Sequence, residues 1–253
     1  MTFVSTIITS YNRPRLIRGA IQSILDQTIQ DFEIFIMDDG SKQETRDVIN
    51  QYVSQDSRIK AFFSPEPNNF EERKHDASIR YSIQINKALD LVSGKYISYL
   101  CDDDYYFPER FERLCGYMED HPEAHVVFGK MRSRLFGSDN PDPYVGGLTD
   151  LPPDDIVEFR RDIESNPAYF KEGPDSQNVY HLDHNMVMHK KDCFNYILKP
   201  YWPEQIEGQI PVGDQLFFRK LAGSGFIFYG VDCWCCVKRF HCINNRYEIE
   251  ILR

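Results

Sequence analysis

Three consecutive carboxylates stand where an apolar run of the sequence stops. Residues 95–101 are largely β-branched and aromatic, Gly94 precedes them, and Asp102, Asp103 and Asp104 follow directly. The length and composition of the run predict a buried strand, so the acids are expected at a strand end. Ligands of α/β sheets bind beyond the carboxyl ends of the strands, where carboxylate oxygens suit a divalent cation and a phosphorylated ligand. Considered alone, a run of acids is more often a solvated turn.

Two more polar segments follow predicted strands in the same way. Residues 9–12 come after an apolar run that begins at Phe3, and residues 38–41 come after the run 32–37. If these strands are parallel, all three polar segments lie along one edge of the sheet. Together they offer an aromatic ring with small hydroxyls, a carboxylate beside a glycine, and a cluster of acids. A nucleoside diphosphate requires this set: stacking and hydrogen bonds for the nucleoside, and a cation for the diphosphate.

The order of the predicted elements places these segments in one fold. Residues 3–10, 32–37 and 59–63 are predicted strands, and helical spacing of apolar residues occurs at 16–25 and at about 44–53. This β-α-β-α-β order, with right-handed crossovers, predicts a mostly parallel sheet. The other predicted elements are a helix through 85–92, the strand before the acids, a helix from Pro108, a strand at 124–129, a strand or strand pair at 176–188, a helix from Val212 and strands from 226 to 240.

The segment from Gly137 to Gly173 is the least regular part of the sequence. It is rich in proline, glycine and aspartate and shows little periodicity. We expect an irregular loop there. A long irregular segment inside a compact domain is usually functional, and we interpret this one as a lid on the acceptor side.

Composition and charge exclude several classes of partner. The chain has 253 residues, of which 42% are hydrophobic and 14% aromatic, so it can bury a sizeable core. Its formal net charge of −10 argues against a nucleic-acid partner and against an anionic membrane surface, because both require basic patches. No apolar run approaches the ~20 residues of a membrane span, and no basic leader precedes the first strand. The sequence therefore predicts a cytoplasmic protein.

The C-terminal tail contains a cluster of cysteines, Cys233, Cys235, Cys236 and Cys242. Their spacing does not form two Cys-x₂₋₄-Cys knuckles, and alternate residues of a strand point to opposite faces, which argues against a zinc site. Buried free thiols in a core strand are the better interpretation. The aromatic residues of this tail are compatible with a homodimer contact.

Four motifs occur in a familiar order. They are Ser-Tyr-Asn; Phe-Glu-Ile-Phe-Ile-Met-Asp-Asp-Gly-Ser; Gly-Lys-Tyr-Ile-Ser-Tyr followed by the acids and Pro-Glu-Arg; and Gly-Asp-Gln. With them the sequence resembles family 2 glycosyltransferases of the GT-A fold, most of all the spore-coat polysaccharide type, closely over residues 3–130 and more loosely over 178–220. The resemblance implies an α/β, Rossmann-like, three-layer sandwich with a mostly parallel central sheet. It implies one domain, residues 1–253, with a nucleotide-binding half to about residue 130 and an acceptor-side half and tail from about residue 131.

The same resemblance implies roles for residues on the donor side. Thr9 and Tyr11 would line a uracil pocket, Asp39 would hydrogen-bond the base, and Arg80 would reach the base or the phosphates. The full set implied to bind the nucleotide is Thr9, Tyr11, Asn12, Asp39, Arg80, Asp102 and Asp103.

The resemblance further implies a metal site for Mn²⁺ or Mg²⁺ among the three acids. Asp104 occupies the last position of an Asp-x-Asp motif and is the first choice for a ligand. Asp103 is the other candidate, because the spore-coat type shifts the emphasis to that position. Asp102 and Asp103 would contact the ribose and the surroundings of the metal, and Asp102 together with Asp104 fits the usual Asp-x-Asp motif.

Asp214 falls where the family keeps its general base. An inverting transferase requires a carboxylate opposite the leaving diphosphate, able to take the proton of the acceptor hydroxyl. A helix N-cap is the alternative for Asp214, and both roles are compatible. Asp183 and His184 match an Asp-His pair of the spore-coat type, which would shape the acceptor side or the donor-sugar side or have a structural role. His241 lies where some GT-A enzymes have a third metal ligand, although its surroundings do not match.

The implied activity is a metal-dependent, inverting transfer of one sugar from a nucleotide-diphosphate sugar to a hydroxyl of a glycan or glycoconjugate. UDP is the favoured nucleotide, and dTDP is compatible. A Gln-x-x-Arg-Trp motif does not follow Asp214, which argues against processive synthesis. A sugar nucleotidyltransferase is a weaker alternative, because residues 10–14 contain no glycine. A catalytically degenerate, nucleotide-sugar-binding partner subunit is the non-enzymatic alternative.

Overall fold

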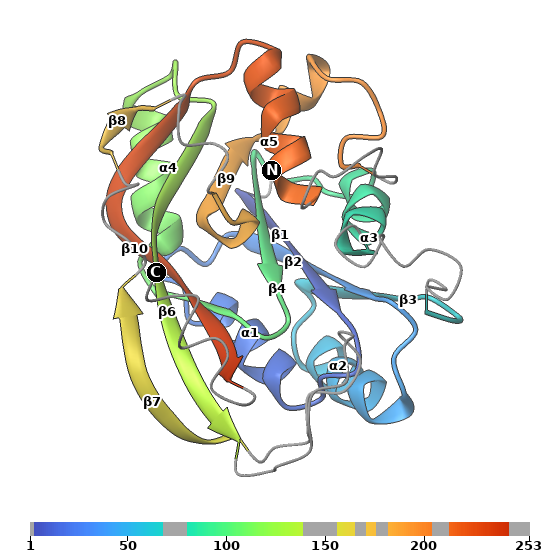
Figure 1. Cartoon of the computed structure of the whole chain (residues 1–253). Helices are drawn as coiled ribbons and strands as arrows, with labels where there is room; N and C mark the ends of the chain where they lie inside the picture. The colour runs from blue at the N-terminus through green and yellow to red at the C-terminus, as the bar shows by residue number, and fades with distance from the viewer. Residues whose placement is uncertain are drawn as a thin grey trace.

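The computed structural model follows the predicted β-α-β order and describes residues 3–67, 80–138, 156–164, 171–175, 182–203 and 213–242 (Figure 1). Its strands are β1 (Val4–Ser10), β2 (Phe32–Asp38), β3 (Ile59–Phe63), β4 (Tyr96–Cys101), β5 (Tyr105–Tyr106), β6 (Val126–Ser138), β7 (Ile156–Glu164), β8 (Gly173–Pro174), β9 (Val187–Lys190) and β10 (Phe228–Cys242). Its helices are α1 (Leu16–Leu25), α2 (Gln43–Gln55), α3 (Arg80–Leu89), α4 (Arg110–Asp120) and α5 (Gly213–Gly223), with 3₁₀ turns η4 (His184–Met186) and η5 (Lys191–Asn195). Among these helices, none combines the length and the hydropathy that crossing a bilayer requires.

One large sheet runs through the molecule in the strand order β3-β2-β1-β4-β9-β6-β10-β5. The strands β1, β2, β3 and β4 run parallel to one another, and so do β6 and β10. Strand β9 runs antiparallel to both of its neighbours, β4 and β6. Nearly every residue of β1 and β2 is buried, as expected for central parallel strands that are covered on both faces. The predicted α/β class and mostly parallel sheet are confirmed.

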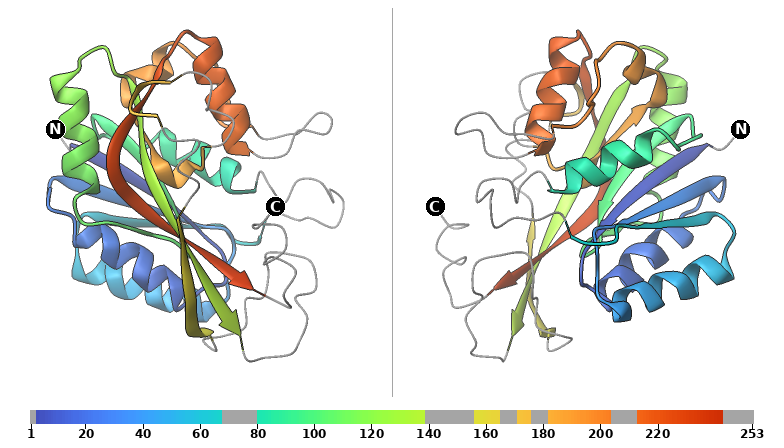
Figure 2. Two further views of the ribbon diagram at one scale, coloured as in Figure 1. Left: turned by 60° about the vertical axis from the view of Figure 1, so that its left-hand side comes forward. Right: turned by 90° about the vertical axis from the view of Figure 1, so that its right-hand side faces the viewer.

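Apolar cores on the two faces of the sheet give the predicted three layers. One core packs α1, α2 and α4 against the strands and includes the fully buried Ile21, Ile49 and Phe111. The other packs α3 and α5 around Trp202 and Phe217, whose rings stack with their centres 4.5 Å apart. Figure 2 shows α1 and α2 on one side of the strands and α3 on the other.

The prediction of an irregular segment over residues 137–173 is wrong in part. Strand β6 continues to Ser138, and β7 pairs with it in antiparallel register; Figure 2 shows these strands beside the end of β10. A strand is favoured by Ile156, Val157 and Phe159. The prediction misses it because it rests on the overall composition of the segment, in which prolines, glycines and aspartates predominate. Residues 139–155 and 165–170 lie outside the described part of the chain, so the lid stays a prediction.

The predicted strand or strand pair at residues 176–188 is instead a turn followed by a strand where the structure describes it. Residues 184–186 form η4, and residues 176–181 lie outside the described part. Asp183 accepts a hydrogen bond of 2.9 Å from the backbone N–H of Asn185, which closes the turn before β9 begins. An aspartate that hydrogen-bonds its own backbone competes with extended structure in this way.

The tail that we predict as strands is one strand, β10, whose register is irregular around Trp234. Cys235 and Cys236 lie in β10 as fully buried free thiols, as predicted, whereas Cys233 is a free thiol that is only partly buried. The side chains of His241 and Cys242 lie outside the described part, so the interpretation of His241 as a metal ligand stays untested.

Glu33 of β2 joins three strands and the turn before β4. Its carboxylate accepts hydrogen bonds from the Ser5 hydroxyl of β1, the Lys60 ammonium of β3, and the backbone and hydroxyl of Ser93. Burial opposes ionisation of this carboxyl, but the hydrogen bonds outweigh burial and lower the pKa of Glu33 to about 2.

This pKa makes the stability of the fold depend on pH through Glu33. The lowered pKa stabilises the folded state above the unfolded-chain value of about 4.3, and the contribution is lost as the pH falls toward the folded value of about 2. We expect Glu33→Gln to reduce the free energy of unfolding at neutral pH by about 2 kcal/mol. The difference from wild type should shrink below about pH 4 in urea unfolding curves. A pH-independent difference would contradict the assignment, and Glu66→Gln at an exposed position is the matched control.

Candidate active site

The three predicted polar strand ends meet at one edge of the sheet. Strand β1 lies between β2 and β4 in parallel register, which places Ser10 beside Asp38 and Thr9 beside Cys101. A cavity of about 110 Å³ opens at this edge. It is lined by Thr9, Ser10, Tyr11, Arg13, Asp39, Arg80, Tyr81, Gln84, Cys101 and Asp102. Of the residues predicted to bind the nucleotide, only Asn12 and Asp103 are missing from this lining.

One end of the cavity is built around the buried carboxylate of Asp39. Arg80 of α3 forms an ion pair with one oxygen of Asp39, and the Gln84 amide donates a hydrogen bond of 2.7 Å to the other. The guanidinium carbon of Arg80 lies 3.6 Å from the centre of the Tyr11 ring. A carboxylate oxygen accepts more than one hydrogen bond, so Asp39 can also accept from a ligand. An aromatic face, a cation and a hydrogen-bond acceptor are thus gathered at this end.

Two turns shape this end of the cavity. Gly40 has a φ of +79°, and a side chain there would collide with the backbone of Pro67, so glycine is required. The backbone N–H of Asn12 donates to the Ser41 hydroxyl, and its side-chain oxygen accepts from the Lys42 N–H, both at 2.8 Å. Asn12 therefore ties the turn after β1 to the turn after β2.

The three acids after β4 have different partners. Asp102 is buried, and its two oxygens accept hydrogen bonds from the backbone N–H of Tyr11 at 2.9 Å and from Arg13 at 2.8 Å. Burial raises the pKa of Asp102 to about 6, although Arg13 opposes the shift. Arg13 also forms an ion pair of 2.6 Å with Asp103. Asp104 is buried and accepts a hydrogen bond of 2.7 Å from the side-chain amide of Asn185.

Asp103 and Asp104 fit a divalent cation better than Asp102 does. Together with Cys101 they present ligand atoms that all lie within 4.8 Å of one another. Carboxylate oxygens are the ligands that Mg²⁺ and Mn²⁺ prefer. Burial and the neighbouring acids raise the pKa of the Cys101 thiol, which makes a thiolate ligand unfavourable there. Both oxygens of Asp102 already accept hydrogen bonds within the protein.

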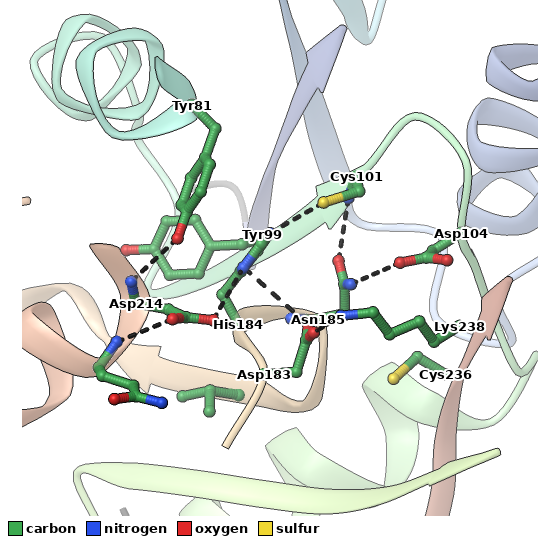
Figure 3. Close-up of polar contacts among 12 residues, drawn as sticks. Tyr81, Tyr99, Cys101, Asp104, Asp183, His184, Asn185, Asp214, Cys236 and Lys238 are labelled. Atoms are coloured by element: carbon green, nitrogen blue, oxygen red, sulfur yellow. Dashed lines mark hydrogen bonds and ion pairs between the residues drawn. The ribbon is translucent and has the colours of Figure 1, made fainter. Parts of the chain in front are cut away.

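The turn η4 connects the acids to the second half of the chain (Figure 3). Asn185 donates to Asp104, and its side-chain oxygen accepts from the backbone N–H of Cys101 at 2.9 Å. Asp183 forms an ion pair with Lys238 of β10. Burial would raise the pKa of Asp183, but the charge of Lys238 and the hydrogen bond from the Asn185 N–H outweigh burial and lower it, so this carboxyl stays ionised.

Asp214 lies at the start of α5, buried and on the far side of His184 from Cys101 (Figure 3). Its backbone N–H donates to the Tyr81 hydroxyl at 3.0 Å, and its Oδ1 accepts from the Gln215 N–H at 2.8 Å. Its Oδ2 lies 3.5 Å from Nδ1 of His184. Asp214 is the second residue of α5 and accepts from the next residue, whereas an N-cap precedes its helix and accepts from an N–H two or three residues on. The contact with Gln215 is therefore not the bond that the N-cap alternative anticipates, and it does not engage Oδ2.

Sequence reasoning missed several residues of this site, namely Arg13, Tyr81, Gln84, Asn185 and Lys238. A signal was available for the pair on α3, because Arg80, Tyr81 and Gln84 are spaced i, i+1 and i+4 and lie on one side of a helix. No comparable signal exists for Lys238, whose partner Asp183 is 55 residues away in the chain.

The protein has the fold of a GT-A glycosyltransferase. Its mostly parallel α/β sheet has a cavity and acids at the strand ends, and a buried carboxylate lies at a helix start. Solved structures share this fold. TarS of S. aureus aligns with a TM-score of 0.66 at 17% identity, covering 94% of this chain and 37% of TarS. The mannosyltransferase PcManGT of Pyrobaculum calidifontis, solved with GDP-Man and Mn²⁺, aligns with a TM-score of 0.58 at 12% identity, covering 93% of this chain and 56% of that one.

The chain belongs to glycosyl transferase family 2, whose family model matches residues 5–145. CgeD of Bacillus subtilis is 33% identical over 226 residues, which is 86% of this chain and 46% of CgeD. WfaP of Escherichia coli, named as a UDP-Glc:α-D-GlcNAc-diphosphoundecaprenol β-1,3-glucosyltransferase, is 36% identical over 119 residues, 47% of this chain and 42% of WfaP. The chain thus spans less than half the length of these curated relatives.

Proposed function

We propose that this protein is a metal-dependent, inverting glycosyltransferase that moves one sugar from a nucleotide-diphosphate sugar to a hydroxyl acceptor. The observation that carries the proposal is one continuous set of contacts. It begins at the cavity lined by Tyr11 and Asp39, passes the acids after β4, and ends at the buried carboxylate of Asp214. The fold of solved glycosyltransferases and the family membership support the same reaction class.

The base of the donor would bind at the Asp39 end of the cavity. Uracil and thymine carry an imide N–H that can donate a hydrogen bond to the carboxylate of Asp39. A base could stack on the face of the Tyr11 ring that Arg80 does not cover. Cytosine has a hydrogen-bond acceptor at that position. Two acceptors would then face each other, and no hydrogen bond could form between cytosine and Asp39. The complexes of S. aureus TarS with UDP and with UDP-GlcNAc support a uracil nucleotide as the donor here too.

Asp104 and Asp103 would hold Mn²⁺ or Mg²⁺. When bound, the cation would neutralise the negative charge that develops on the leaving diphosphate. The chain's own residues prepare this position. The amide of Asn185 orients the Asp104 carboxylate at 2.7 Å, and Arg13 balances the charge of Asp102 and Asp103.

Asp214 would act as the general base. In a single displacement the acceptor oxygen forms the new bond to the sugar carbon, the bond to the diphosphate breaks, and the acceptor proton passes to the carboxylate. Oδ2 of Asp214 is not engaged by the helix start and has two lone pairs, so it can take that proton while it also faces His184. The acceptor would be a glycan or glycoconjugate; TuaG of Bacillus subtilis, 34% identical over 126 residues, is named as a putative teichuronic acid biosynthesis glycosyltransferase.

Calorimetric titration with UDP, dTDP, GDP and CDP, each with Mn²⁺ and again with EDTA, tests the proposal. We expect UDP to bind with Mn²⁺ and to lose at least about tenfold in affinity with EDTA, because the diphosphate then meets the acids without a cation. CDP should bind about tenfold or more weakly than UDP, since Asp39 then lacks a donor.

Absence of binding by all four nucleotides would contradict the donor assignment. Metal-dependent binding with no consumption of UDP-glucose or UDP-GlcNAc would instead favour the alternative of a nucleotide-sugar-binding partner subunit.

A further inference from the structure

His184 is held rigidly between the acids and Asp214. The residue is buried, and its ring stacks on Tyr81 with centres 5.0 Å apart and an angle of 20° between the planes. The indole of Trp202 meets the same ring nearly at right angles, with centres 5.9 Å apart. Aromatic contacts on a face and an edge leave the imidazole little freedom to rotate. The directions of its two nitrogens are therefore fixed by the fold (Figure 3).

The two nitrogens of this ring face different groups. Nε2 lies 3.2 Å from the sulfur of Cys101, whereas Nδ1 lies 3.5 Å from Oδ2 of Asp214 and 3.9 Å from Oδ1 of Asp183. Asp183 already binds Lys238 and the Asn185 N–H. Nδ1 is buried from solvent and has no hydrogen bond of normal length among the described residues.

The proton positions follow from these neighbours. Nδ1 faces oxygens of two carboxylates, which accept hydrogen bonds and do not donate them when ionised, so the ring N–H belongs on Nδ1. Nε2 of the neutral ring is then an acceptor, to which the Cys101 thiol can donate its S–H. That N–H then points at the oxygen of Asp214 that the helix start does not engage. A separation of 3.5 Å is slightly long for a hydrogen bond, and contacts of this kind often tighten when substrate binds.

We propose that His184 is a positioning residue, which orients the Asp214 carboxylate through its Nδ1–H and is itself oriented by the Cys101 thiol. The inference rests on the proposed role of Asp214 as the base. His184 keeps its proton throughout, and the proton of the acceptor ends on Asp214. Because Cys101 is followed directly by the acids, this arrangement ties the position of the base to the strand end that holds the diphosphate.

Two substitutions of His184 distinguish the role of Nδ1 from that of Nε2. The amide of asparagine can reach the place of Nδ1, and the longer glutamine places its amide where Nε2 was. We expect His184→Gln to lower kcat for Mn²⁺-dependent hydrolysis of UDP-glucose or UDP-GlcNAc by about 10- to 100-fold, with KM changed by less than about threefold. His184→Asn should recover most of kcat, because it restores the donor toward Asp214.

Equal kcat values for wild type and both variants would overturn the proposal. So would equal losses in both variants, since loss of packing alone would explain them. Thermal unfolding of each variant checks that the fold is retained.

A second measurement needs no ligand and separates this inference from the proposed function. Long-range ¹H–¹⁵N NMR spectra report which imidazole nitrogen carries the proton, and the His184→Asn spectrum assigns the signal. We expect the Nδ1–H form, with a resonance that shifts in Asp214→Asn. An Nε2–H form would overturn the proposal. If the wild-type protein binds no nucleotide and hydrolyses no donor, the proposed function is contradicted. The NMR spectra would still show whether Nδ1 of His184 carries the proton that faces Asp214.

Discussion

Asp214→Asn is expected to lower sugar transfer by about 10²- to 10⁴-fold while leaving UDP affinity within about twofold of wild type. The amide has the shape of the carboxylate and can still accept the hydrogen bond from the Gln215 N–H at the start of α5. It cannot take a proton from an acceptor hydroxyl. Because Asp214 is not part of the cavity lining at the strand ends, the nucleotide should bind as before.

Steady-state rates of donor consumption and calorimetric UDP titrations, measured on the same preparations, test this expectation. Asp192→Asn, an exposed aspartate at η5, is the matched control for loss of one carboxylate. If transfer survives in Asp214→Asn, the residue has only a structural role at the start of α5. If UDP binding is lost together with turnover, the substitution has disturbed the fold rather than the proton transfer.

The second large effect is expected at Asp104. Asp104→Asn should lower turnover by about 100-fold or more and make UDP binding nearly independent of Mn²⁺, because a metal ligand contributes several kcal/mol to stabilising the leaving group. The asparagine can keep the hydrogen bond with Asn185, which limits the change to the charge. UDP titrations with Mn²⁺ and with EDTA measure the lost metal dependence directly.

Asp102→Asn is the matched comparison, since it removes the neighbouring charge. Both oxygens of Asp102 are engaged by Tyr11 and Arg13, so this variant should keep the Mn²⁺ dependence even if its affinity for UDP falls. Loss of Mn²⁺ dependence in Asp102→Asn but not in Asp104→Asn would reverse the ligand assignment. Near-wild-type turnover of Asp104→Asn would reject the metal role of this residue.

The donor side of the site could be predicted from sequence because its residues follow strands that are recognisable locally. Thr9 and Asp102 come directly after short apolar runs and Asp39 one residue after another, and parallel pairing of β1 with β2 and with β4 brings these strand ends together. Strand β4 pairs with β1 and not with the preceding strand β3, so the place of Asp102 follows from the parallel arrangement expected of the whole sheet.

The contacts that complete the site depend on elements far apart in the chain, which no local pattern encodes. Asn185 meets Asp104 across 81 residues, and Tyr81 meets Asp214 across 133. The first pair arises because the antiparallel strand β9 places η4 beside the end of β4. The second pair joins α3 to α5, which pack on the same core. The missed strand β7 has a different cause, since its apolar residues are diluted by turn-forming residues on both sides.

We expect a destabilising substitution to have a different effect in each of the two cores of the sandwich. Helices α3 and α5, which carry Arg80 and Asp214, rest on the same core around Trp202. A defect in that core would shift the nucleotide end and the base end together, and would reduce the rate per folded molecule. A defect of equal size in the core beneath α1, α2 and α4 would chiefly reduce the yield of folded protein. Specific activity is therefore expected to report on the packing of the core around Trp202, and expression level on the packing of the core on the opposite face of the sheet.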